Sequence, residues 1–201
     1  MESKFALDYV AKEIHRQAPG ADVSTYTYGF AMKHKHQINK LIKGGMLITH
    51  SSGVMVIERG AQPAKAVFIS PVQPVSRIKL FIRALVKTVY HSWKIISFKD
   101  RKKLLLILGS NAFEFIAHPW QNLKPFVNGD VSRFDLRKIL PRHPIADSAR
   151  VIISHNDEMF TGEENKLDEL ADLGVDVIYV DAMHDEIFID TPRIIAAALN
   201  N

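Results

Sequence analysis

The stretch Met46-Leu47-Ile48-Thr49-His50-Ser51-Ser52-Gly53 decides the fold of this chain. Its first four residues are apolar or β-branched without alternation, which is typical of a strand covered on both faces in a parallel sheet. A helix predicted from Val54 to Arg59 and closed by Gly60 follows, and residues 66–69 read as a second buried strand. Strand, turn, helix and strand form a βαβ unit, so the stretch predicts an α/β fold.

The alternation of strands and helices continues on both sides of this unit. Such alternation with buried strands predicts a mostly parallel sheet flanked by helices on both faces. The further elements that we expect are a helix after Ser3 that ends at Pro19, a strand at 23–28, a helix around 38–42 closed by Gly44, a strand at 151–153, a helix at 163–173, a strand at 175–180 and a helix at 192–199.

Length and composition favour one domain over residues 1–201, because 201 residues with 47% hydrophobic content can bury one sizeable core. Residues from about 71 to 149 interrupt the alternation with helical patterns and prolines but no convincing strand. We therefore predict one helical insertion there. Its first part, 75–96, is apolar on one side and basic on the other, and the apolar side is predicted to lie over the active site as a lid.

Charge and cysteine content narrow the classes of partner and compartment. Nine Lys or Arg residues lie between Arg77 and Lys103 against the single acid Asp100, so a second interpretation places the segment on an anionic membrane surface. Nucleic-acid binding is disfavoured because the cations lack interleaved aromatics. No cysteine is present, and Met1 to Lys4 begin no apolar leader, so we expect a cytoplasmic protein. The pattern leaves open whether copies of the chain associate.

Three residues with complementary chemistry follow predicted strand ends, where the reactive groups of open α/β sheets gather. Ser51 follows the strand at 46–49, Asp157 follows 151–153, and His184 follows 175–180. A serine hydroxyl needs a base to remove its proton, and the base needs a carboxylate to hold its tautomer. These residues are the predicted catalytic triad, with Asp185 and Glu158 as alternative carboxylates.

The turn around Ser51 would also help to stabilise negative charge. A serine on a tight strand-to-helix turn exposes its oxygen, and the N–H of the next residue points toward a developing oxyanion. Here that donor is the backbone N–H of Ser52. Thr49, His50 and Gly53 complete the predicted nucleophile turn.

At these residues the chain resembles the α/β hydrolase superfamily, in which Ser, acid and His follow in this order. Thr49 to Gly53 is similar to the turn of the family's esterases and lipases, and 154–157 resembles its acid loop. Ala182-Met183-His184-Asp185, before a helix with Pro192 near its start, resembles its histidine motif. The resemblance covers about residues 4–200 and implies an α/β hydrolase-like sheet of reduced strand number with a lid.

Two features depart from the family pattern. Thr49 stands where the family prefers glycine, and a branched residue can crowd the turn. The strands and oxyanion loop that precede the first helix in the family have no counterpart before Lys4. The second oxyanion donor would come from residues 1–3, from the lid or from nowhere, and losing one donor costs about 3–4 kcal/mol of transition-state stabilisation.

Two functions follow as hypotheses. The first is a serine hydrolase that cleaves a small hydrophobic carboxylic ester through an acyl-enzyme, and the second is an inactive hydrolase-fold protein that binds a ligand or another protein. No cofactor is implied. No metal site is assigned either, because the scattered histidines lack partners at metal-ligand spacing along the sequence.

Overall fold

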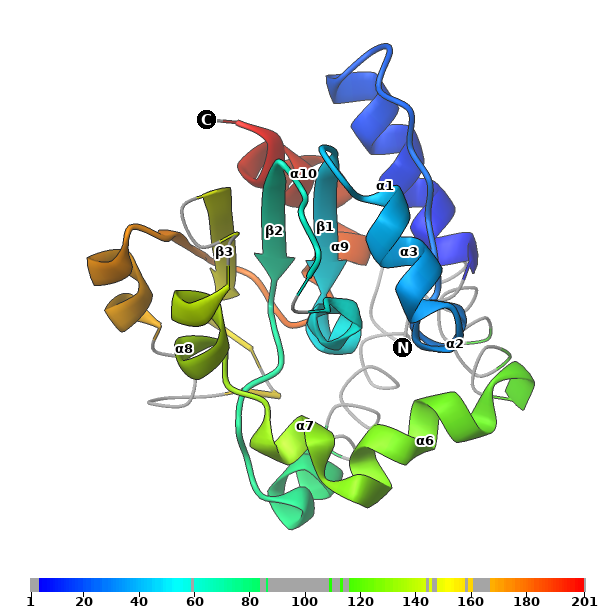
Figure 1. Cartoon of the computed structure of the whole chain (residues 1–201), viewed down its shortest axis with the longest axis vertical. Helices are drawn as coiled ribbons and strands as arrows, with labels where there is room; N and C mark the ends of the chain where they lie inside the picture. The colour runs from blue at the N-terminus through cyan, green and yellow to red at the C-terminus, as the bar shows by residue number, and fades with distance from the viewer. Residues whose placement is uncertain are drawn as a thin grey trace.

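The computed structural model describes residues 4–58, 60–83, 86, 109, 113, 116–143, 145, 148–157, 159, 160 and 167–200. At its centre lies a four-stranded sheet in the order β1-β2-β3-β4, and all three strand pairs are parallel (Figure 1). The strands are β1 (Met46–His50), β2 (Lys65–Ile69), β3 (Ala149–Ser154) and β4 (Asp176–Val180). The predicted parallel α/β architecture is confirmed.

Helices surround this sheet. Residues 4–17, 35–41 and 191–199 are helical, close to where the sequence predicts them. The helices are α1 (Lys4–Gln17), α2 (Tyr28–Lys33), α3 (Lys35–Leu41), η1 (Ser51–Val56), α6 (Pro119–Asn128), α7 (Asp130–Arg133), α8 (Leu136–Ile139), η2 (Leu140–Arg142), η5 (Asp168–Leu173), α9 (Glu186–Ile189) and α10 (Thr191–Leu199), where η marks a 3-10 helix.

Both faces of the sheet are covered, which explains why its strands read as continuous apolar runs. Successive side chains of a strand point to opposite faces. Phe68 of β2 therefore packs into one apolar cluster with Val151 and Ile153, together with residues of α8 and η5. Val67 and Ile69 pack into the other cluster with Ile152 and residues of α1, α9 and α10. This double burial fixes the strand ends from which the site residues project.

Three predicted elements differ from the structure. Residues 23–28 are not a strand: the chain stays irregular up to Thr27, whose side chain accepts a hydrogen bond from Phe30 N and caps α2. The helix predicted at 54–59 is instead the 3-10 helix η1, which begins at Ser51 and ends at Val56. The described part of the helix predicted at 163–173 is the 3-10 helix η5, closed by Gly174 with φ 83°.

The segment from 71 to 149 contains helices α6, α7 and α8, and its described residues form no strand before β3. Of the helix predicted at 75–96, residues 77–83 and 86 are helical and residues 75 and 76 are not; residues 84, 85 and 87–96 lie outside the described residues. Within the part of the chain that the structure describes, no helix combines the length and apolar character needed to cross a membrane. That the segment forms a lid, and that the chain is one domain, stay predictions.

Candidate active site

Ser51 lies on a tight turn between β1 and η1. β1 ends at His50, and Ser51 itself has φ 51°, in the left-handed region that non-glycine residues rarely adopt. Such a conformation costs about 1–2 kcal/mol, and the surrounding fold must supply it. This conformation lets η1 begin directly after the last residue of β1, so that the Ser51 hydroxyl lies at the end of the strand.

The turn leaves room for Thr49 beside Gly53. A Cβ built on Gly53 would lie 3.5 Å from the Thr49 Cβ, which is ordinary van der Waals contact. Even a side chain at position 53 would therefore not clash with the branched Thr49. The crowding expected from the sequence at Thr49 is therefore absent from the Thr49–Gly53 contact.

Helix α3 holds the far end of η1 in place. Lys35 Nζ donates to the carbonyl oxygen of Met55 at 2.9 Å, and Asn39 Nδ2 donates to that of Val56 at 2.9 Å. The N–H of Glu58 donates back to Asn39 Oδ1 at 3.0 Å. Burial lowers the pKa of Lys35, since a charged amine is less favourable away from water. These bonds satisfy the carbonyl groups that the end of a short helix leaves unpaired.

Ser51, His184 and Asp157 form one continuous chain of hydrogen bonds. Ser51 Oγ lies 2.8 Å from His184 Nε2, and His184 Nδ1 lies 2.8 Å from Asp157 Oδ2. His184 and Asp157 are buried, whereas Ser51 is half-buried. A buried carboxylate that accepts from Nδ1 leaves Nε2 facing the hydroxyl as a proton acceptor. This arrangement is suited to withdrawing a proton from Ser51.

The loop after β3 fixes Asp157 for this contact. Asp157 Oδ1 accepts hydrogen bonds from the N–H groups of Met159 at 2.8 Å and Phe160 at 2.9 Å. The Phe160 ring also lies beside the His184 ring, with 5.6 Å between the ring centroids. One carboxylate oxygen is thus held by the backbone, so the other remains directed at the imidazole.

Of the two alternative carboxylates, Asp185 lies beside a different histidine. Its Oδ1 is 3.9 Å from His50 Nε2, whereas the carboxylate bonded to His184 Nδ1 is that of Asp157. Glu158 lies outside the described residues. The geometry therefore favours Asp157 as the partner of His184.

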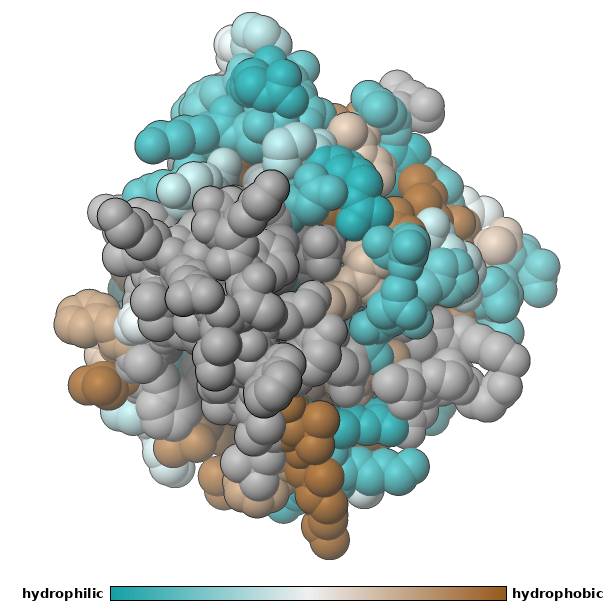
Figure 2. Space-filling model, turned by 180° about the vertical axis from the view of Figure 1, so that it is seen from behind, coloured by the Kyte–Doolittle hydropathy of each residue, from teal (hydrophilic) through white to brown (hydrophobic). Residues whose placement is uncertain are grey.

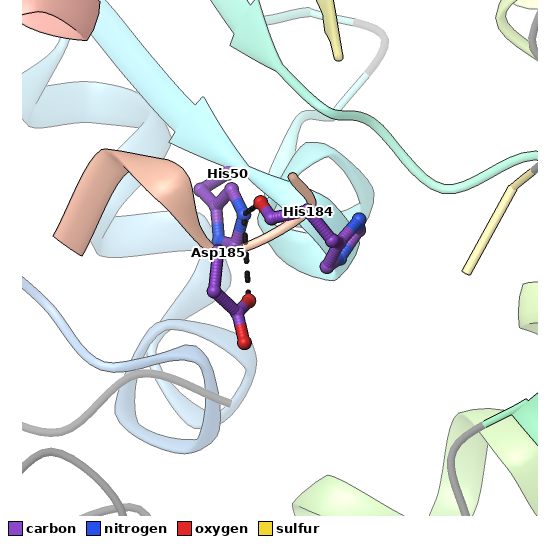
Figure 3. Close-up of side chains that lie close together, drawn as sticks. All are labelled: His50, His184 and Asp185. Carbon is purple, nitrogen blue, oxygen red and sulfur yellow. Dashed lines mark hydrogen bonds and ion pairs between the residues drawn. The ribbon is translucent and has the colours of Figure 1, made fainter. Parts of the chain in front are cut away.

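His50 contacts the site in a way that the sequence does not reveal. Its Nε2 lies 2.8 Å from the carbonyl oxygen of His184, and Figure 3 shows the two residues side by side with Asp185. A carbonyl oxygen only accepts, so Nε2 must carry the proton and donate it. The residue next to Ser51 along the chain is thereby bonded to the main chain of His184, 134 residues away.

Among the described residues, the ligand atoms of these three side chains lie close enough together to hold a metal ion. Ligand atoms of His50, His184 and Asp185 all lie within 4.8 Å of one another. However, both ring nitrogens of His184 are already hydrogen-bonded, to Ser51 and Asp157, and His50 Nε2 faces a carbonyl oxygen. A metal bound there would have to break these bonds, so the donor set fits a hydrogen-bond network better than a metal site.

Ser70 and Ser154 form a second feature that sequence reasoning missed. Ser70 directly follows β2 and Ser154 is the last residue of β3. Both are buried, and their hydroxyl oxygens lie 2.7 Å apart. Ser70 has φ 41°, and its N–H donates to the carbonyl oxygen of Ile152. The two buried hydroxyls satisfy each other's hydrogen-bonding capacity. The pair joins the strand ends that lead to the loops of the site.

A cavity of about 330 Å³ lies beside η1, against the face of the sheet that carries Phe68. Val54, Ile57, Leu136 and Ile145 contribute to its largely apolar lining, and Lys138, Arg142 and His143 also border it. Ser51, His184 and Asp157 are not among the residues that line this cavity. It is therefore distinct from the space next to the Ser51 hydroxyl.

Comparisons with known proteins support the fold. No family model and no curated protein matches the chain. Among solved structures, an enol-lactonase from Burkholderia xenovorans LB400 matches with TM-score 0.55 and 14% identity, over 90% of this chain and 74% of its own. A hydrolase from Oleispira antarctica matches with TM-score 0.54 and 12% identity, over 99% and 88%. The thioesterase domain from the curacin biosynthetic pathway matches with TM-score 0.51 and 11% identity, over 100% and 87%.

Identities this low carry information about the fold alone, and the fold agrees with the sheet described above. The structures matched share the α/β hydrolase architecture. The order of Ser51, Asp157 and His184 along the chain, and their place after the ends of parallel strands, are those on which the sequence resemblance rests. This chain has the α/β hydrolase fold.

Proposed function

We propose that the protein is a serine hydrolase that cleaves a carboxylic ester of a hydrophobic acyl substrate. The observation that carries this proposal is the hydrogen-bond chain from Ser51 Oγ through His184 to Asp157, with 2.8 Å at each step. A buried imidazole between a carboxylate and a serine on a turn with positive φ has the parts that nucleophilic acyl transfer needs.

The reaction would proceed in two stages. His184 Nε2 takes the proton of Ser51 as its oxygen attacks the ester carbonyl, and Asp157 stabilises the imidazolium that forms. The imidazolium then gives the proton to the departing alcohol, which leaves an acyl group on Ser51. In the second stage His184 activates a water molecule, which releases the acid and restores the serine.

Ser52 is the proposed donor to the oxyanion. Its N–H follows Ser51 in the first turn of η1, where the N–H groups have no acceptor within the helix. An N–H at this place can bond the oxygen that gains negative charge in the transition state. Two of the matched structures are named an enol-lactonase and a thioesterase domain, and lactones and thioesters are also opened by attack at a carbonyl carbon.

One observation favours the second candidate, a protein that binds a ligand without turning it over. β1 is an edge strand of the described sheet, so no neighbouring strand within the described residues supplies a second N–H on that side of Ser51. With a single donor, the transition state would lose about 3–4 kcal/mol of stabilisation. The protein would then bind a ligand at the same site and hydrolyse it slowly or not at all.

Labelling with a fluorophosphonate discriminates between the two functions. An activated serine attacks the phosphorus and becomes stably modified, so we expect one adduct per chain at Ser51, detected by intact mass and located by peptide mapping. Ser51→Ala should abolish the adduct, and Ser24→Ala, which changes an exposed loop serine, should leave it unchanged. Folded protein that stays unmodified would favour the binding module over the enzyme.

His50 offers a test of how the site is positioned. Because its Nε2 donates to the main chain of His184, we expect it to hold the imidazole at the correct distance from Ser51. His50→Phe keeps a ring to pack edge-on against Phe188 but removes the donor, and should lower kcat about 5- to 10-fold with KM nearly unchanged.

His50→Gln serves as the matched variant, because its amide N–H can reach the same carbonyl oxygen. Most of the lost kcat should return in this variant. If His50→Phe and His50→Gln are equally slow, or if the loss appears in KM alone, the hydrogen bond to His184 does not position the base.

A further inference from the structure

Helix α6 presents its apolar side to solvent. Trp120, Leu123 and Val127 recur at intervals of three and four residues, so they share one face of the helix, and all three are exposed. The residues of α6 that are buried are Asn122 and Pro125. A surface helix of a globular protein normally buries its apolar stripe and exposes its polar side. In α6 the apolar residues are exposed instead, together with Lys124.

The helical residues 77–83 also expose large apolar side chains. Ile78, Phe81 and Ile82 are exposed by 75%, 65% and 52%, and helical Val86 is exposed as well. Leu80 is the large apolar side chain of this run that is buried. The apolar side predicted to cover the active site therefore faces outward over the residues that the structure describes.

The two helices meet at one end. Gly129, which follows α6 with φ 77°, lies directly against the guanidinium group of Arg77, so closely that a Cβ there would overlap it. Figure 1 places α6 and the residues around 80 at the lower edge of the molecule, and Figure 2 shows hydrophobic side chains along that edge. The docking surface, as we define it, consists of Ile78, Phe81, Ile82, Val86, Trp120, Leu123 and Val127.

Positive charge accompanies this surface. Arg77, Lys79 and Lys124 are exposed on the same two helices. The sequence from Arg77 to Lys103 holds nine Lys or Arg residues and one acid. Apolar side chains that are flanked by cations match the chemistry of an anionic bilayer, in which acyl chains lie beneath negative headgroups.

We propose that the docking surface binds the surface of an anionic lipid bilayer. A second copy of the chain fits less well, because a two-fold contact would bring the same basic segments together and their charges would repel. A bilayer satisfies both the apolar faces and the cations. The proposal goes beyond the proposed function and does not depend on it, since binding needs no turnover.

The docking surface is joined directly to the candidate active site. Arg83 Nη1 donates to the carbonyl oxygen of Met159 at 2.9 Å, and the N–H of Met159 donates to Asp157 Oδ1. A bilayer bound at Phe81 and Ile82 would therefore lie next to Arg83, whose side chain contacts the loop that holds Asp157.

Binding to vesicles tests the proposal with the full chain. Trp120 is one of two tryptophans, so a Trp93→Phe background leaves it as the sole indole reporter. Vesicles of phosphatidylcholine mixed with anionic phosphatidylglycerol should shift its emission to the blue and carry the protein down on sedimentation. We expect affinity at least about tenfold lower for pure phosphatidylcholine vesicles, and a loss of affinity as salt rises.

Matched variants test separately the apolar side chains and the cations of the docking surface. Phe81→Ser and Lys79→Glu should each weaken binding about tenfold or more, whereas Leu41→Ser and Lys43→Glu, exposed on or just after α3, should not. Circular dichroism checks that the Trp93→Phe variant is folded, and co-sedimentation of the native chain checks binding without that substitution. Equal affinity for neutral and anionic vesicles, or no binding to either, would overturn the proposal. So would a concentration-dependent dimer that Phe81→Ser dissociates, which would assign the surface to a second copy.

Discussion

Replacing Ser51 with alanine lowers kcat/KM for a hydrophobic ester by a factor of ~10⁴ or more, because the attacking oxygen is lost while the rest of the site remains. Hydrolysis of a p-nitrophenyl ester of a short fatty acid measures this change. His184→Ala should cause a loss of similar size. The double variant Ser51→Ala with His184→Ala should be no slower than either, since the two residues act as one unit through their 2.8 Å bond.

The backbone conformation of Ser51 provides a control that separates loss of the nucleophile from loss of stability. At φ 51° a glycine is unstrained, whereas alanine is not, so Ser51→Gly should melt higher than Ser51→Ala while both lack the nucleophile. The difference should be about 1 kcal/mol in the free energy of unfolding, measured with urea. Residual hydrolysis in Ser51→Ala above one tenth of the native rate, in protein shown to be folded, would exclude Ser51 as the nucleophile.

The sheet could be predicted from the sequence because its faces are covered by helices, so that the central strands β2 and β3 are buried on both faces. Runs such as 46–49 and 66–69 lack alternation and are bounded by turn residues, and both form strands in the structure. The strand predicted at 23–28 was wrong because β propensity describes how side chains fit a pleated sheet, and the segment pairs with none of the strands that the structure describes. Thr27 instead accepts a hydrogen bond from Phe30 N and begins a helix.

The proximity of Ser51, Asp157 and His184 followed from topology, since parallel strands bring their carboxyl ends to one edge of the sheet. The bond from His50 to the His184 carbonyl did not follow, because it depends on the conformation of a main-chain group 134 residues away. The outward apolar sides of α6 and residues 77–83 were also beyond prediction. Helical periodicity shows which residues share a face and not where that face points.

The exchange Asp157→Asn tests the electrostatics of the site with almost no change in shape. Asp157 Oδ1 accepts two N–H groups, from Met159 and Phe160, so an asparagine must keep its oxygen there. Its NH₂ group then faces His184 Nδ1 and forces this nitrogen to accept, which places the imidazole proton on Nε2. An Nε2 that carries a proton cannot take one from Ser51, so kcat should fall by a factor of ~10⁴.

Asp185→Asn is the matched control, because Asp185 is the next residue after His184 but lies near His50 rather than His184 Nδ1. Its kcat should stay within a few-fold of native, and fluorophosphonate labelling of Ser51 should proceed at a similar rate. Thermal melts of both variants check that the fold is intact. If Asp185→Asn were the slower variant, Asp185 would be the carboxylate that supports the base, and the loop after β4 would have to rearrange during the reaction to bring it to His184 Nδ1.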